Sequence, residues 1–196
     1  HAEDPVAEWL RISAEQEKWV RYLDTKEYLH IISKETDIKV GIKGRKWINC
    51  DGKENFPDGE IFTSPVENDI NGHICFSFPG IYAGKEIEGI RLEVKDGKVV
   101  KAAADKGEDL LKALLQTDEG ASFFGEVAIG TNYGIQKFTR NMLFDEKIGG
   151  TIHMAIGDSM PEAGGRNRSA IHWDMLCDMR SGGKIYADGQ LFYENG

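Results

Sequence analysis

The apolar residues of this 196-residue chain occur in short runs separated by glycine-containing turns, and this spacing limits the fold more than any other feature of the sequence. The longest apolar runs, such as residues 74–78, have the length of a β-strand. None approaches the roughly 20 apolar residues that a helix needs to cross a bilayer. Many short strands together with 23 glycines are typical of β-rich domains. We therefore predict an α+β fold: a β-rich domain with a mixed or antiparallel sheet, an N-terminal helix and one further helix.

Two segments have helical spacing. The first begins at Asp4 and Pro5, an acidic N-cap followed by a proline in the first turn, and continues to about Asp24. Its middle, residues 12–19, is so polar that we expect the helix to lie on a surface or to link two domains. The second covers residues 108–115, where leucines recur at helical spacing. We therefore divide the chain into a linker helix, residues 1–26, and one β-rich domain, residues 27–196.

The rest of the chain alternates between strand-sized segments and turns. Asp-Gly pairs at 96–97 and 188–189 predict two hairpins, and the Asn-Gly pair at 71–72 predicts a third turn. The segments predicted as strands are 28–32, 37–42, 60–63, 73–78, 87–94, 98–103, 123–129, 151–156, 170–176, 184–187 and 190–193.

Charge and cysteine content exclude several classes of protein. Lysine and arginine number 24 against 33 aspartates and glutamates, a net charge of −9. Nucleic acids and anionic membranes bind basic surfaces, so we expect neither as a partner. The three cysteines form no CxxC pair, which argues against a disulfide framework and a thiolate zinc site. The first residues lack the basic and apolar regions of a secretory signal, so we expect a cytoplasmic protein.

The strongest local indication of chemistry is His172-Trp173-Asp174, which lies in an apolar stretch. In a strand, residues two apart face the same way, so His172 and Asp174 would project from one face. An imidazole beside a carboxylate suits zinc, cobalt or manganese. A buried, hydrogen-bonded His–Asp pair without an ion explains the same spacing.

Three further polar residues interrupt or begin apolar strands. His153 lies within the apolar segment 150–157, where a hydrogen-bonded core histidine is the alternative to a ligand. Glu126 is bracketed by apolar residues, and a buried carboxylate needs a cation unless the strand exposes it on a polar face. Glu60 begins a strand after a loop, a position where sites often lie, although taken alone it is better explained as an ordinary surface glutamate.

Together these residues make a set of two glutamates, two histidines and one aspartate. Two metal ions that share one carboxylate, with two further ligands each, need five protein ligands. Such a pair of ions orients a carbonyl or phosphoryl group and generates a hydroxide at neutral pH. The five candidates are Glu60, Glu126, His153, His172 and Asp174. The hypothesis requires that their strands converge.

Four segments, in this order along the chain, carry a resemblance to a known family. They are DGEIFTSP at 58–65, FGEVAIG at 124–130, NMLFDEKIGGTIHMAIG at 141–157 and SAIHWDM at 169–175. These motifs resemble those of the thermophilic metalloaminopeptidases, the M29-type peptidases that include aminopeptidases T, S and II. The similarity extends from about Val6 to the C-terminus and covers the catalytic C-terminal half of those proteins.

The resemblance implies that the metal ligands are the same five residues. It also implies a cocatalytic pair of divalent ions, which are zinc, cobalt or magnesium depending on the member. The implied reaction is hydrolysis of the N-terminal residue from peptides with a free N-terminus. The bridging carboxylate stays open among Glu60, Glu126 and Asp174, and Glu60 is our candidate for the catalytic proton shuttle. Family members form dimers, so we expect a homodimer.

The chain departs from the family pattern in two ways. Members have an additional N-terminal α/β domain, and they carry a tyrosine in the pattern His-x-Ala-x-Gly-x-x-Tyr, where this chain has Met160. The departures support an alternative function, a metal-binding domain without turnover. A third interpretation is a binding module in which the five residues are ordinary surface and core groups.

Overall fold

The computed structural model describes residues 3–196; His1 and Ala2, the start of the predicted segment 1–26, lie outside the described residues. The helices of the described part are α1 (Pro5–Leu23), α2 (Glu108–Leu115), α3 (Met142–Asp145) and the 3₁₀ turn η1 (Pro161–Ala163). The sequence predicts α1 and α2 but not α3, because a single turn of four residues is too short to show a helical period. None of these helices combines the length and the apolar content needed to cross a bilayer.

The strands form two large sheets and one small hairpin, and neighbouring strands pair antiparallel throughout the described residues. The seven-stranded sheet has the order β14 (Gln190–Glu194), β13 (Lys184–Ala187), β1 (Tyr28–Ser33), β2 (Thr36–Gly41), β5 (Ile70–Cys75), β8 (Arg91–Lys95), β9 (Lys98–Ala103). The five-stranded sheet has the order β12 (His172–Asp178), β11 (Thr151–Gly157), β10 (Phe124–Gly130), β4 (Glu60–Thr63), β3 (Ile48–Cys50). The hairpin is β6 (Gly80–Tyr82) with β7 (Lys85–Ile87). The predicted α+β fold is confirmed.

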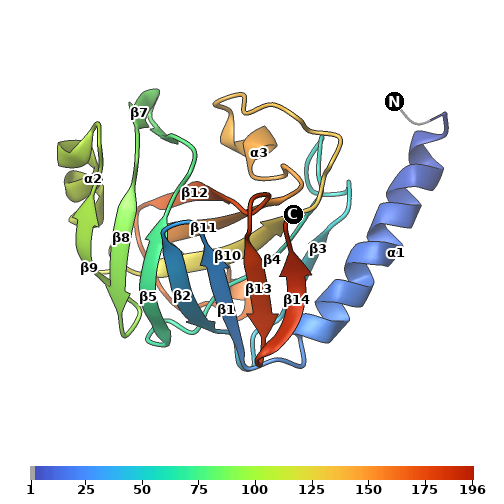
Figure 1. Ribbon diagram of the computed structural model, residues 1–196, viewed down its shortest axis with the longest axis horizontal. Coiled ribbons are helices and arrows are strands. Elements are labelled where there is room, and N and C mark those ends of the chain that lie inside the picture. Colours follow the sequence, from blue (N-terminus) through green and yellow to red (C-terminus); the bar gives the residue numbers. More distant parts are fainter. Residues whose placement is uncertain (1–2) are drawn as a thin grey trace.

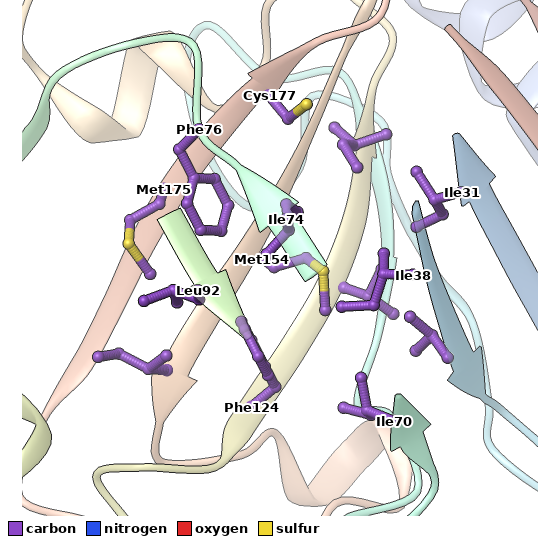
Figure 2. Close-up of a cluster of buried hydrophobic side chains, with 14 of the residues drawn as sticks. Ile31, Ile38, Ile70, Ile74, Phe76, Leu92, Phe124, Met154, Met175 and Cys177 are labelled. Carbon is purple, nitrogen blue, oxygen red and sulfur yellow. The ribbon is translucent and has the colours of Figure 1, made fainter. Parts of the chain in front are cut away.

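The main core lies between the two large sheets. Figure 1 shows the strands of the five-stranded sheet running across those of the seven-stranded sheet. Figure 2 shows the side chains that fill the space between them, with Ile31, Ile38 and Leu92 from one sheet and Met154 and Met175 from the other. Because successive residues of a strand point to opposite faces, only every second residue of β11 and β12 contacts this core; in β10 an irregularity between Phe124 and Glu126 interrupts the alternation, and Phe124, Val127 and Ile129 are the core residues. The intervening residues point to the outer face of the five-stranded sheet.

Both Asp-Gly hairpins are confirmed. The pair at 96–97 joins β8 to β9, and the pair at 188–189 joins β13 to β14. All four residues have positive φ, between 48° and 80°. Turns of this backbone shape match the twist of the flanking strands, and glycine at the second position makes them inexpensive.

The turn predicted at 71–72 is wrong, because both residues lie inside β5. Gly72 has a φ of 131°, and a Cβ at this position would lie 2.2 Å from the backbone oxygen of Asp37 on β2. The glycine therefore permits the close approach of two strands. The single strand predicted over 87–94 is also wrong, since Gly89, with a φ of 63°, separates β7 from β8.

Helix α1 packs on β3 and β4, at the right of Figure 1. Its polar middle contains Gln16, whose side chain is only 1% exposed, so this part of the helix is not simply a solvated surface. The Gln16 amide nitrogen donates to Asn49 Oδ1 (2.6 Å) and to the backbone oxygens of Cys50 (3.0 Å) and Glu60 (3.1 Å). Its oxygen accepts from the Thr131 hydroxyl at 2.7 Å. The helix thereby fixes the start of β4.

The division into segments 1–26 and 27–196 stays a prediction.

Candidate metal centre

The five candidate ligands lie on the outer face of the five-stranded sheet, on the adjacent strands β4, β10, β11 and β12. Antiparallel pairing places them at neighbouring positions, and most of the residues directly across the strands are small. These partners are Gly130 and Cys50 opposite Glu60, Ala155 opposite Glu126 and Asp174, Ala128 and Leu176 opposite His153, and Gly157 opposite His172. Because glycine and alanine occupy little space, the longer side chains can turn toward one another. The strands therefore converge as the two-metal hypothesis requires.

The burial and spacing of these side chains contradict the interpretations without a metal ion, namely surface glutamates and hydrogen-bonded histidines. Glu60 is 5% exposed and Glu126 is 4% exposed, so neither is a surface glutamate. His153 is fully buried, yet neither of its ring nitrogens has a hydrogen-bond partner among the described residues. It is therefore not a hydrogen-bonded core histidine. His172 Nε2 lies 3.5 Å from Asp174 Oδ2, too far for a well-formed hydrogen bond.

The five side chains form two groups that share one carboxylate. In the first, which we call the His153 group, His153 Nε2 lies 3.0 Å from Glu60 Oε2 and 3.4 Å from Glu126 Oε1. In the second, the His172 group, His172 Nε2 lies 3.4 Å from Glu126 Oε2 and faces Asp174. Glu126 belongs to both groups and directs one oxygen to each histidine.

The unpaired atoms of the two groups test whether a metal ion fits. Within the described residues, Glu60 Oε2, Asp174 Oδ1 and both nitrogens of His153 are buried without a hydrogen-bond partner. Unpaired buried polar atoms are costly and uncommon in folded proteins. Imidazole nitrogens together with carboxylate oxygens are ligands for divalent ions such as zinc, cobalt or manganese. The donor set therefore fits a divalent cation in each group.

The titration of the cluster also reflects its concentration of charge. Burial by itself lowers the pKa of His172, but the carboxylates of Asp174 and Glu126 outweigh it and raise the pKa to about 11. The pKa of His153 is raised for the same reason, by Glu126 and Glu60 against the effect of burial. The pKa values of Glu60 and Glu126 are lowered overall. Burial alone would raise them, but the nearby histidines, together with Lys147 beside Glu60, have the larger effect. The carboxylates therefore concentrate negative charge around both imidazole rings.

The ring of His172 is oriented by the backbone. Its Nδ1 lies 2.8 Å from the carbonyl oxygen of Asp158, to which it donates. A histidine held through one nitrogen presents the lone pair of the other to a metal ion, and this arrangement is common around metal ligands. Asp118 fixes the loop that leads to His172: its carboxylate accepts from the backbone nitrogen of Ala170 at 2.7 Å and from the hydroxyl of Ser169 at 2.8 Å.

A cavity of about 400 Å³ opens over the cluster. Its apolar lining consists of Ile48, Cys50, Phe62, Leu143 and Met160. Its polar lining consists of Glu54, Asn55, Glu60, Glu126, Glu146, Glu162, His172 and Asp174. The volume lies within the range of small-molecule sites. The cavity combines apolar walls with a strongly acidic floor and rim, so it suits a ligand that has both an apolar group and a positive charge.

The structure adds two residues that sequence analysis does not select. Glu146 is 9% exposed and lies with His153 and Asp174 in a further group of possible ligands. Burial and the nearby charge of Glu60 raise the pKa of its carboxyl group to about 7. Lys147 is fully buried and forms ion pairs with Glu146 and with Glu60, the latter at 2.7 Å. The sequence Asp145-Glu146-Lys147 looks like a solvated turn, and no local pattern distinguishes it from one.

The fold and this buried donor set together place the chain among the metalloproteases. It belongs to the thermophilic metalloprotease family (M29), whose family model matches residues 1–196. The expected family is thus confirmed.

Named relatives agree with this assignment. The chain is 31% identical to aminopeptidase AmpS of Bacillus subtilis over 220 residues, which cover 96% of this chain and 53% of the relative. It is 31% identical to aminopeptidase T of Thermus thermophilus over 225 residues, 99% of this chain and 52% of the relative. The chain therefore spans about half the length of these relatives.

Solved structures show the same fold. The structure of AmpT from Thermus thermophilus superimposes with a TM-score of 0.85 at 28% identity, over 98% of this chain and 55% of that one. A 2,5-dihydroxypyridine dioxygenase from Pseudomonas putida matches with a TM-score of 0.72 at 18% identity, over 95% of this chain and 58% of that one. The second similarity shows the fold alone.

Proposed function

We propose that this chain is the metal-binding catalytic domain of an aminopeptidase, and that it uses two divalent ions to hydrolyse the N-terminal residue of peptides. The observation that carries the proposal is the sharing of Glu126 between two groups of buried ligands at the floor of one cavity. Membership of the M29 family and the names of the relatives support it. Because the chain spans about half of those relatives, activity of this chain by itself is part of the proposal.

The five ligands would hold the two ions in the two groups described above. Glu60, Glu126 and His153 would hold one ion, and Glu126 with His172 and Asp174 would hold the other. Among the three carboxylates left open by the sequence, we propose Glu126 as the bridge, because its two oxygens face different histidines. The chemistry that such a pair supplies when bound is polarisation of the scissile carbonyl group and activation of water.

The remaining residues of the cavity would bind and orient the peptide. The apolar wall of Ile48, Phe62 and Leu143 would hold the side chain of the N-terminal residue. The rim carboxylates Glu54 and Glu162 would attract its free ammonium group. An internal peptide bond brings no such positive charge, so this arrangement favours cleavage from the N-terminus.

The transfer of protons requires a group that can hold one near the scissile bond. The sequence assigns this role to Glu60, and the assignment stays a prediction. Glu146 is a second candidate, because it lines the same cavity and the pKa of its carboxyl group is raised to about 7 by burial and by the charge of Glu60. Glu146→Gln that retains both ions but lowers turnover by about 10²-fold or more would support Glu146. Unchanged turnover would exclude it.

A second function, metal binding without turnover, has one specific observation in its favour. Met160 lines the cavity at the position where the family pattern has tyrosine. The backbone of Met160 is held in place, because its nitrogen donates to the Ser64 hydroxyl at 2.9 Å. A thioether carries no proton to donate, whereas a phenol does. Met160→Tyr should raise turnover if the missing phenol limits the reaction, and should leave it unchanged if the domain acts without one.

The test of both functions uses one sample of the full chain. Bound metal per chain would be quantified after addition of zinc, cobalt or manganese, and leucine-p-nitroanilide hydrolysis would be measured beside it. About two ions per chain with turnover would support the aminopeptidase. Two ions without turnover would support the second function, and no bound metal would refute both. The His172→Ala variant should lose bound metal. A homodimer, a cytoplasmic location and the identity of the metal stay predictions.

A further inference from the structure

The two groups of ligands differ in one conspicuous respect, the buried ammonium group of Lys147. Its side chain is 1% exposed, and its Nζ lies 2.7 Å from Glu60 Oε1 and also pairs with Glu146. Glu60 and Glu146 line the cavity, but Lys147 does not. The ammonium group therefore lies behind the cluster, where it contacts a ligand of the His153 group without reaching a substrate.

Lys147 divides the two oxygens of Glu60. It donates to Oε1, while Oε2 faces His153 Nε2 at 3.0 Å and has no hydrogen-bond partner among the described residues. Glu60 consequently offers a metal ion one oxygen only. The His153 group thus has three donor atoms: one oxygen from Glu60, one from Glu126 and one imidazole nitrogen. Glu146, the further possible ligand beside His153, is also paired with Lys147.

The His172 group offers more donor atoms to a metal ion. Both oxygens of Asp174 are free of ammonium or guanidinium partners in the described residues, and one of them has no hydrogen-bond partner at all. Asp174 can therefore ligate through two oxygens, which gives this group four donor atoms with Glu126 and His172.

The two histidine rings also differ in how firmly hydrogen bonds orient them. His172 Nδ1 is fixed on the carbonyl oxygen of Asp158 at 2.8 Å, which leaves Nε2 free to ligate. Neither nitrogen of His153 has a hydrogen-bond partner in the part of the chain that the structure describes. Moreover, a divalent ion in the His153 group would be repelled by the nearby positive charge of Lys147. Donor number, ring orientation and charge all favour the same group.

We propose that the two metal positions are unequal: the His172 group takes up the first ion, and Lys147 keeps the His153 group weaker, so that it is filled last. This inference rests on the proposed two-ion function. It assigns to Lys147 the part of a positioning residue that acts through Glu60. At limiting metal, the chain would hold one ion, bound by Glu126, His172 and Asp174.

The order of loading can be measured without any peptide substrate. The metal-free full chain would be titrated with Co²⁺, and binding followed by calorimetry and by the visible absorption of the bound ion. We expect two steps whose dissociation constants differ by at least tenfold. His153→Ala should retain the tighter step, and His172→Ala should abolish it. These two variants leave Lys147 in place, so they decide the order even if substitution of the lysine prevents folding.

The part played by Lys147 needs a second comparison. Lys147→Met should tighten the weaker step by about 10-fold or more, because it removes the repulsion of a nearby positive charge and frees Glu60 Oε1 to ligate. Lys101→Met is the matched control, because it removes the same charge from an exposed lysine paired with Glu93 on the other sheet. It should leave both steps unchanged.

Three results would overturn the inference: two steps of equal affinity, loss of the tighter step in His153→Ala, or a weaker step unchanged within twofold in Lys147→Met. In each case the unsubstituted chain still binds two ions, so the proposed function would survive. If no Co²⁺ binds at any concentration, the two-ion function itself is refuted and the inference fails with it.

Discussion

Replacing Gln16 by methionine should destabilise the protein far more than its place on a polar helix suggests. The side chain is 1% exposed and takes part in four hydrogen bonds, to Asn49, Cys50, Glu60 and Thr131. Methionine preserves its approximate size but cannot replace these bonds. The amide nitrogen has two hydrogens for its three acceptors, so with the bond from Thr131 the contacts amount to about three full hydrogen bonds. At about 1 kcal/mol net for each, the loss is about 3 kcal/mol. For a domain of this size, that corresponds to a decrease in Tm of about 9 °C.

Equilibrium unfolding in urea, followed by tryptophan fluorescence, would measure this loss. Lys18→Met is the matched control on the same helix, since the Lys18 side chain is 71% exposed and its ion pair with Glu15 lies at the surface. We expect the control to change the free energy of unfolding by no more than about 0.5 kcal/mol. If Gln16→Met costs no more than Lys18→Met, the hydrogen bonds of Gln16 do not hold helix α1 on strand β4, and our account of that interface is wrong.

Three further predictions follow from particular contacts. Gly72→Ala should lower the free energy of unfolding by about 3 kcal/mol, measured in urea, because the new Cβ would lie 2.2 Å from a backbone oxygen. Gly84→Ala should lower it by only about 1 kcal/mol, because φ is also positive there but no atom of the described residues lies within 4 Å. Equal losses would contradict the close-approach explanation. Asp118→Ala should weaken metal binding by about 10-fold in a Co²⁺ titration, because the loop before His172 loses its anchor; unchanged affinity would show that this loop needs no such support. Metal binding at pH 7 should release close to two protons per chain, because the pKa values of His153 and His172 are raised above their ordinary value and both rings must lose a proton to ligate. The apparent metal affinity should therefore rise with pH above 7. Calorimetry in buffers of different ionisation enthalpy measures the number of protons released, and a value near zero would refute this prediction.

Much of the candidate site could be predicted because the residue types carry the chemistry. His172 and Asp174 stand two apart in an apolar strand, so their common face follows from the period of a β-strand. Glu126 and His153 interrupt strands that are otherwise suited to a core, and all seven residues of each strand are buried. A charged group in such a strand needs a partner, and this requirement is visible in the sequence.

Other features depend on contacts between distant segments and leave no local pattern. Lys147 and Glu60 are separated by 87 positions, and their ion pair exists only because tertiary packing brings β4 and the loop before β11 together. Gln16 is 44 positions from Glu60 in the sequence and looks like one more polar residue of a surface helix. The pair at 71–72 has the composition of a turn, but the approach of β2 makes it part of a strand.

By itself, the sequence determined the β-rich α+β class, the two Asp-Gly hairpins, the family and the five candidate ligands, because each depends on the order and types of neighbouring residues. The tertiary structure decided that the five side chains converge, that Glu126 lies between the two histidines, and that Glu146 and Lys147 join the cluster. These features depend on sheet order, cross-strand register and burial. Such properties arise only when segments far apart in the chain pack together, and the charges of buried groups act strongly on one another only after packing has removed the water between them.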